Sequence, residues 1–98
     1  MKITKLPDGD KLTVKIEGRL DTTTAPELEN ELKASYEGVS EMLLDVSQME
    51  YISSAGLRVF LSAHKTMSKQ GILKVKGANP DIIEIFEVTG FSDILNLE

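Results

Sequence analysis

The stretch from residue 41 to residue 57 limits the possible folds of this chain more than any other. It begins with a run of apolar residues, Met42, Leu43, Leu44 and Val46, that shows little alternation with polar positions. Such a run is typical of a central strand that is covered on both faces. A short polar loop follows, and the amphipathic pattern of a helix begins near Ser54. A buried strand that leads directly into a helix predicts an α/β fold.

The residues before this junction predict a hairpin and a first helix. Strand patterns cover residues 1–6 and 12–16, and the turn residues between them predict an antiparallel pair. Thr24 and Glu27 have the spacing of a capping box at the start of a helix, and Gly38 ends that helix. The apolar positions of this helix form one stripe, Ala25, Leu28, Leu32 and Tyr36.

The residues after the junction predict two further helices and one strand. A helix over residues 54–70 precedes a strand over 72–76, and a last helix begins at Asn79-Pro80 and ends at Gly90. The predicted core stripe of helix 54–70 is Leu57, Phe60, Leu61, His64 and Met67. Another face of that helix is basic and carries Arg58, Ser62, Lys65 and Lys69. Residues 91–98 are too few to assign.

The order of these elements is strand, strand, helix, strand, helix, strand, helix. Strands separated by helices predict parallel neighbours that are joined by right-handed crossovers. A chain of 98 residues is of single-domain size. We therefore expect one α/β domain over residues 1–98, with helices packed against a mixed, mostly parallel sheet of about four strands. The first pair of strands is the antiparallel hairpin.

The composition argues against several classes of partner. The chain has 16 acidic and 11 basic side chains and a net charge of -5, which opposes binding to nucleic acid or to an anionic membrane surface. It has no cysteine, so it forms no disulfide and no thiolate metal site. No signal peptide and no apolar run of ~18 residues is present. We expect a cytoplasmic protein with no cofactor and no metal.

Ser54 is the strongest candidate for a functional residue. It stands at the start of a predicted helix, where backbone N–H groups lack intrahelical partners and the helix dipole is positive. Such a position suits a phosphate group. A serine at this point is also a favoured N-cap in any protein, and the two roles are compatible.

Catalytic interpretations of the same region are weaker. The Gly-x-Ser-x-Gly motif of serine hydrolases is absent, and the lone histidine, His64, lies about 15 Å from Ser54 along the helix. We expect His64 to be a partly buried packing residue. Asp45 and Ser47 suggest an aspartyl-phosphate or metal site, but the acidic cluster of such sites is absent. Hydrogen bonding of these two side chains to the loop backbone is the favoured interpretation.

Residues 44–57, Leu-Asp-Val-Ser-Gln-Met-Glu-Tyr-Ile-Ser-Ser-Ala-Gly-Leu, resemble the signature of the STAS domain of bacterial anti-sigma factor antagonists. The element Gly18-Arg19-Leu20-Asp21 before a polar loop and a helix also resembles that family, as does the order of elements. The resemblance implies a STAS-type fold and a regulatory binding module instead of an enzyme. It also implies two protein partners, a serine/threonine kinase that is an anti-sigma factor and a PP2C-type phosphatase.

In such families the unphosphorylated antagonist binds the kinase, and the sigma factor is released. The resemblance places the phosphate acceptor at Ser54. The family usually has Asp before this serine and Ser or Thr after it, whereas this chain has Ser53 and Ala55. Ser53 is therefore an alternative acceptor.

The predicted partner surface combines this segment with the loop after the second strand. In this topology the loop approaches the Ser54 end of the sheet, and Arg58, one helical turn after Ser54, could contact a phosphate there. The expected surface consists of Arg19, Asp21, Thr22, Ser53, Ser54, Ala55, Gly56 and Arg58. The alternative function is a nonphosphorylated STAS subunit that scaffolds a transporter or a lipid-trafficking complex. A nucleotide-binding protein with weak hydrolytic activity ranks last, because no Gly-rich phosphate loop is present.

Overall fold

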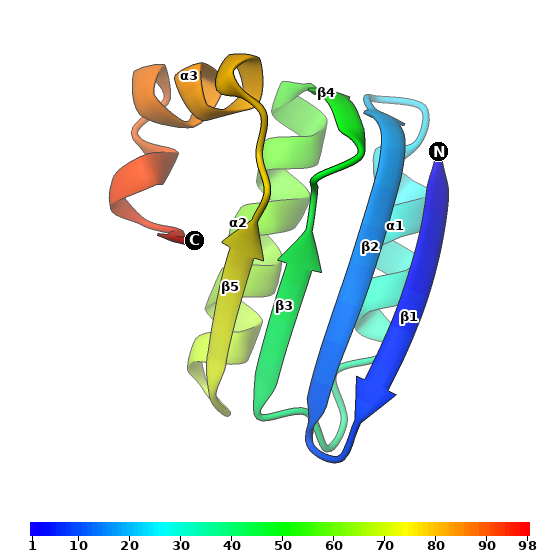
Figure 1. Ribbon diagram of the computed structural model, residues 1–98. Helices are drawn as coiled ribbons and strands as arrows, with labels where there is room; N and C mark the ends of the chain where they lie inside the picture. Colours follow the sequence, from blue (N-terminus) through cyan, green and yellow to red (C-terminus); the bar gives the residue numbers. More distant parts are fainter.

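The computed structural model describes residues 1–98 and contains one six-stranded mixed sheet (Figure 1). The strand order is β1-β2-β3-β5-β6, and β4 pairs with one end of β2. The strands are β1 (Lys2–Asp8), β2 (Lys11–Leu20), β3 (Glu41–Asp45), β4 (Met49–Ile52), β5 (Ile72–Lys76) and β6 (Asn96–Leu97). The β1–β2 pair is antiparallel and every other pair is parallel. The α/β class, the hairpin and the mostly parallel sheet are confirmed, but the expected number of about four strands is too small.

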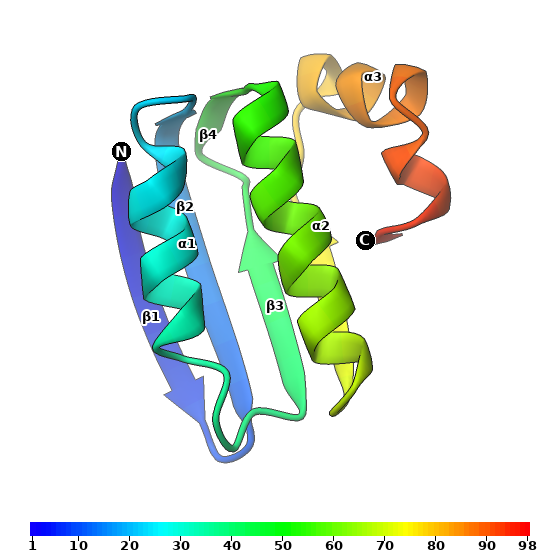
Figure 2. The same ribbon diagram turned by 180° about the vertical axis from the view of Figure 1, so that it is seen from behind.

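Helices α1 (Ala25–Lys33) and α2 (Ser54–Ser68) lie side by side on one face of the sheet (Figure 2). Helix α3 (Pro80–Val88) lies at the end of the sheet where α2 begins, and it contacts β4 (Figure 1). The crossovers through α1 and α2 proceed across the sheet in the same direction, so right-handed connections place both helices on the same side. No helix of this chain has the length and apolar composition needed to cross a bilayer.

This arrangement corrects the prediction that strand β3 is covered on both faces. Met42 and Leu44 are fully buried under the helices, whereas Leu43 points to the opposite face and is only partly buried. The opposite face carries charged side chains, such as the ion pair between Lys74 and Glu41 with an N–O distance of 3.6 Å. The apolar run 42–46 therefore reflects one buried face and one apolar residue on the open face.

The hydrophobic core lies between the helices and the sheet, and every fully buried side chain in it is apolar. Phe60 of α2 and Phe86 of α3 have ring centroids 6.3 Å apart and join the two helices. The buried face of α2 differs from the predicted stripe, because Val59 and Ala63 are buried whereas Leu61 and His64 are only partly buried. Helix α2 packs against α1 as well as against the sheet.

Several element boundaries differ from the sequence-based expectation. Strand β2 continues to Leu20, beyond the strand pattern at residues 12–16, because β4 pairs with its last residues. Helix α1 ends at Lys33, before the expected end at Gly38. The unassigned C-terminal residues form a short 3-10 helix, η1 (Phe91–Asp93), and strand β6, with the side chain of Leu95 buried.

Gly71, between α2 and β5, is required by a close backbone approach. A methyl group at this position would overlap the backbone oxygen of Ser40, which accepts a hydrogen bond from the N–H of Ile72. We expect Gly71→Ala to lower the free energy of unfolding by about 3 kcal/mol, because backbone atoms cannot move aside as a flexible side chain can. Urea denaturation measures this change.

Gly38→Ala is the matched control for this substitution. Its new methyl group would meet no atom within 4 Å, and only the left-handed backbone conformation, with φ of 78°, opposes it. We expect a loss of about 1 kcal/mol for the control. Equal losses for the two variants would contradict a rigid contact at Gly71.

Candidate functional site

The candidate site lies where β2 and β4 end and α2 begins. Leu20 and Ile52 are paired in the parallel β2–β4 ladder, and the N–H of Ser53 donates to the carbonyl oxygen of Leu20 at 2.9 Å. The loop after β2 and the first turn of α2 are therefore adjacent, although more than 30 residues separate them in sequence. The backbone pairing of β2 with β4 therefore produces the predicted approach of this loop to the start of α2. Figure 1 shows the end of β2 beside β4.

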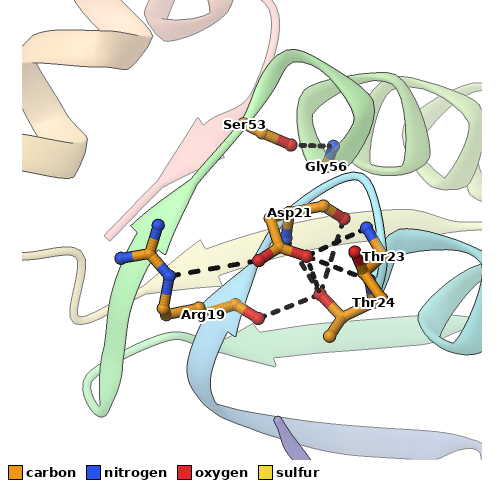
Figure 3. A network of polar contacts seen from close by, with 6 residues as sticks. All are labelled: Arg19, Asp21, Thr23, Thr24, Ser53 and Gly56. Carbon is orange, nitrogen blue, oxygen red and sulfur yellow. Dashed lines mark hydrogen bonds and ion pairs between the residues drawn. The ribbon is translucent and has the colours of Figure 1, made fainter.

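The two serines at the start of α2 have different environments. Ser53 is the N-cap, and its side-chain oxygen accepts a hydrogen bond from the N–H of Gly56 at 3.4 Å (Figure 3). Ser54 is the first residue of the helix, and its side chain is exposed and forms no hydrogen bond within the protein. The interpretation of Ser54 as the N-cap is therefore wrong, and the capping role falls to Ser53.

Gly56 allows the first turn of α2 to lie directly on the strand ends. A Cβ atom at this position would be 2.7 Å from Cγ of Leu20 and 2.9 Å from Cγ1 of Ile52. These distances are shorter than van der Waals contact, so a larger residue would push the helix start away from β2 and β4. The absence of a side chain at position 56 therefore sets where Ser54 lies.

Asp21 holds the loop after β2 in shape (Figure 3). Its Oδ1 accepts hydrogen bonds from the N–H groups of Thr23 and Thr24, at 3.0 and 3.1 Å. The hydroxyl of Thr24 accepts from the N–H of Asp21 and donates to the carbonyl oxygen of Arg19, each at 2.9 Å. The N–H of Thr24, followed by that of Thr23, holds the pKa of Asp21 below its usual value of 3.8.

This network corrects the predicted capping box at the start of α1. The side chain of Thr24 makes no cap hydrogen bond to the helix, because its hydroxyl is directed back to the residues before it. The carboxylate of Asp21, and not the hydroxyl of Thr24, accepts hydrogen bonds from the free N–H groups of the loop. Thr22 is exposed at the tip of the loop and lies outside the network.

Arg19 lies between an aromatic ring and a carboxylate. Its guanidinium carbon is 4.5 Å from the ring centroid of Tyr51, and its Nε is 4.0 Å from Oδ2 of Asp21. Tyr51 is 38% exposed and was absent from the predicted surface. The available signal was the position of Tyr51 within the signature segment 44–57, but only the β2–β4 register shows that Tyr51 faces Arg19.

Asp45 and Ser47 form a turn after β3. Oδ1 of Asp45 accepts a hydrogen bond from the N–H of Ser47 at 3.0 Å. Partial burial raises the pKa of Asp45, but the hydrogen bonds of Ser47 and the charges of Lys76 and Lys15 outweigh it and hold the pKa below 3.8. These contacts order the connection between β3 and β4, and they do not place either side chain against Ser54.

The remaining predicted residues, Ala55 and Arg58, border a hollow of ≈ 360 Å³ between α1 and α2. Arg58 is exposed and Ala55 is partly buried.

His64 is partly buried on the same continuous helix, so a Ser54–His64 pair does not form. No group of three or more His, Asp or Glu side chains is arranged to hold a metal ion.

Comparison with known proteins gives a consistent family assignment. The model of the family described as STAS domain matches residues 2–98. The chain is 36% identical to BtrV of Bordetella bronchiseptica over 96 residues, covering 96% of this chain and 83% of BtrV. It is 31% identical to the anti-sigma-B factor antagonist of Listeria monocytogenes over 94 residues, covering 93% of this chain and 82% of that protein.

Solved structures share the fold at lower sequence identity. An anti-sigma factor antagonist from Mycobacterium paratuberculosis superposes with a TM-score of 0.89 at 22% identity, covering 98% of this chain and 83% of that one. The Bacillus cell fate determinant SpoIIAA in its phosphorylated form superposes with a TM-score of 0.76 at 11% identity, covering 99% and 91%.

We expect Gly56→Ala to destabilise the protein and to displace Ser54. The new methyl group must move Leu20, Ile52 or the helix start, at a loss of about 1–3 kcal/mol in the free energy of unfolding. Urea denaturation measures the loss, and backbone amide chemical shifts of residues 53–55 report the displacement. Ala55→Gly, which removes a methyl group from the neighbouring residue, is the control. Unchanged shifts in Gly56→Ala would contradict a role of Gly56 in placing Ser54.

Asp21→Ala tests the loop network through its pH dependence. The folded-state pKa of Asp21 is lowered, so its stabilising contribution is fully present above the unfolded pKa and is lost as the pH falls through the folded one. The difference in unfolding free energy between wild type and Asp21→Ala should be constant near neutral pH and should shrink below pH 3.8. Thermal unfolding across this range measures it, with Asp81→Ala as an acidic-to-neutral control. A difference that grows on acidification would contradict this assignment.

Proposed function

This chain belongs to the STAS domain family, and we propose that it is an anti-sigma factor antagonist whose binding is switched by phosphorylation of Ser54. In this proposal the unphosphorylated module, residues 1–98, binds an anti-sigma factor serine/threonine kinase and causes release of the sigma factor. The kinase then phosphorylates Ser54, and a PP2C-type phosphatase removes the phosphate. The kinase and phosphatase activities belong to the partners. The relatives with which the chain aligns over most of its length include anti-sigma-B factor antagonists, which supports this proposal.

The observation that carries the proposal is the exposed, unbonded hydroxyl of Ser54 at the first position of α2. A kinase can reach this hydroxyl without breaking a hydrogen bond of the fold. The side-chain oxygen of Ser53 is partly buried and accepts from Gly56, so its modification would disturb the helix cap. Accessibility and capping therefore both favour Ser54 over Ser53 as the acceptor.

A phosphate at Ser54 is compatible with the fold but not with a partner fitted to a neutral serine. It adds about -1.5 to -2 charges, which the N-terminal N–H groups and dipole of α2 stabilise. A partner must instead desolvate this dianion on binding. We propose that Arg58, exposed one turn after Ser54, pairs with the phosphate. Phosphorylation then changes partner affinity and leaves the fold intact.

The proposed partner surface surrounds this hydroxyl. Asp21 is held by the loop network and the guanidinium of Arg19 lies against Tyr51, which lowers the side-chain entropy that these residues lose when a partner binds. Tyr51 joins the surface because it is exposed beside Arg19. The surface otherwise consists of Thr22, Ser53, Ser54, Ala55, Gly56 and Arg58.

We expect a mass increase of one phosphate when the protein is incubated with ATP and the proposed partner, an anti-sigma factor serine/threonine kinase. Intact-mass spectrometry should show the increase in wild type and in Ser53→Ala, and none in Ser54→Ala. A mass increase that persists in Ser54→Ala and disappears in Ser53→Ala would move the acceptor to Ser53. No increase in any form would favour a nonphosphorylated scaffold, which should instead co-purify stably with a membrane or ATPase partner.

A further inference from the structure

One face of α2 carries a row of cationic side chains. The proposed switch involves only the first of them, Arg58, which pairs with the phosphate on Ser54. We call Arg58, Ser62, Lys65 and Lys69 the α2 stripe. Their spacings of four, three and four residues place them on one side of the helix, and all four side chains are exposed. The stripe extends over about 16 Å of α2, starting one turn from Ser54.

The three cations of the α2 stripe have no ionic partner within the protein. The structure has six ion pairs, and none of them includes Arg58, Lys65 or Lys69. By contrast, Lys33 on the neighbouring helix α1 pairs with Glu29 at 3.2 Å. The one acidic residue that borders the hollow beside Arg58 is this same Glu29, and its ion pair is with Lys33 and not with a cation of the α2 stripe.

The helix dipole accounts for only part of this pattern. Lys65 and Lys69 lie near the C-terminal end of α2, where the dipole favours a positive charge. Arg58 lies near the N-terminal end, where the dipole favours a negative one. The whole row is therefore not explained by the stability of the isolated helix.

The surface along the α2 stripe is hollowed at two adjoining places. One hollow, of ≈ 360 Å³, lies between α1 and α2, and the second, of ≈ 290 Å³, lies along α2 itself. Both are bordered by Arg58 and Ser62, so they join. Together they run from Ala55, next to Ser54, to Lys69.

We propose that the α2 stripe is the docking surface for an acidic segment of the partner kinase. The inference rests on the proposed function and extends its contact surface by three helical turns. Guanidinium and ammonium groups pair with carboxylates, and the hydroxyl of Ser62 adds a hydrogen-bond donor between them. A phosphate on Ser54 then repels the acidic segment at one end of the stripe. The phosphate also competes with the carboxylates of that segment for the guanidinium group of Arg58.

The test compares the double variant Lys65→Glu/Lys69→Glu with the control Lys2→Glu/Lys11→Glu. Both variants change the net charge equally, and the control residues are exposed on strands β1 and β2. Calorimetric titration with the proposed partner kinase should show at least about tenfold weaker binding of the stripe variant at low salt. The difference should shrink at high salt, because exposed charges are screened. The control should bind within about twofold of wild type.

Three results would overturn this inference. The first is equal affinity of the two variants for the kinase, and the second is a loss of affinity that does not depend on salt. The third is a change in the sedimentation of the stripe variant alone, because that would make the stripe a contact between copies of this chain. Circular dichroism excludes misfolding of the variant. If Ser54 gains phosphate in wild type while the stripe variant binds normally, only the docking inference fails. If wild type neither gains phosphate nor binds the kinase, both fail.

Discussion

The pairing of β2 with two different strands is the contact on which the candidate site depends. The first half of β2, residues 11–15, pairs with β3, and its last residues, 18–20, pair with β4. The register shifts between Gly18 and Arg19, and Gly18 has φ of 91°, a conformation that glycine adopts without steric penalty. The shift lies within the β2–β4 ladder and brings Arg19 opposite Tyr51 and Leu20 opposite Ile52. The β2–β4 pairing therefore positions both the loop that contains Asp21 and the residue from which α2 starts.

The adjacent serines explain how a helix start can present a hydroxyl without losing its cap. The signature that this chain resembles usually has Asp before the acceptor, and the structure shows that residue 53 is the N-cap. Asp and Ser serve this role about equally well, so Ser53 preserves the cap although the carboxylate is absent. The replacement also removes a negative charge beside the residue that would carry the phosphate. The departure from the signature is therefore compatible with the cap geometry.

The sequence predicted elements that local signals determine and missed those that distant pairing determines. Asn79 was expected to start the last helix, and its side chain does accept from the N–H of Ile82 at 2.9 Å. Strand β4 has only four residues with no clear alternation, and it exists because β2 is beside it. The capping box failed for a related reason, because the hydroxyl of Thr24 has better partners in the residues before it. The contact of Tyr51 with Arg19 depends on the same distant pairing, so no local pattern could predict it.

Screening limits how a phosphate on Ser54 can act. At physiological ionic strength the Debye length is about 8 Å, so the added charge is strongly felt by groups within one or two helical turns, such as Arg58. Lys69 lies more than 20 Å away along the helix, by about 1.5 Å per residue, and is screened from it. An acidic segment bound along α2 would therefore lose contacts mainly at the Ser54 end. The remaining loss of affinity must come from desolvating the dianion against the partner, which requires Ser54 to lie inside the contact and not at its rim.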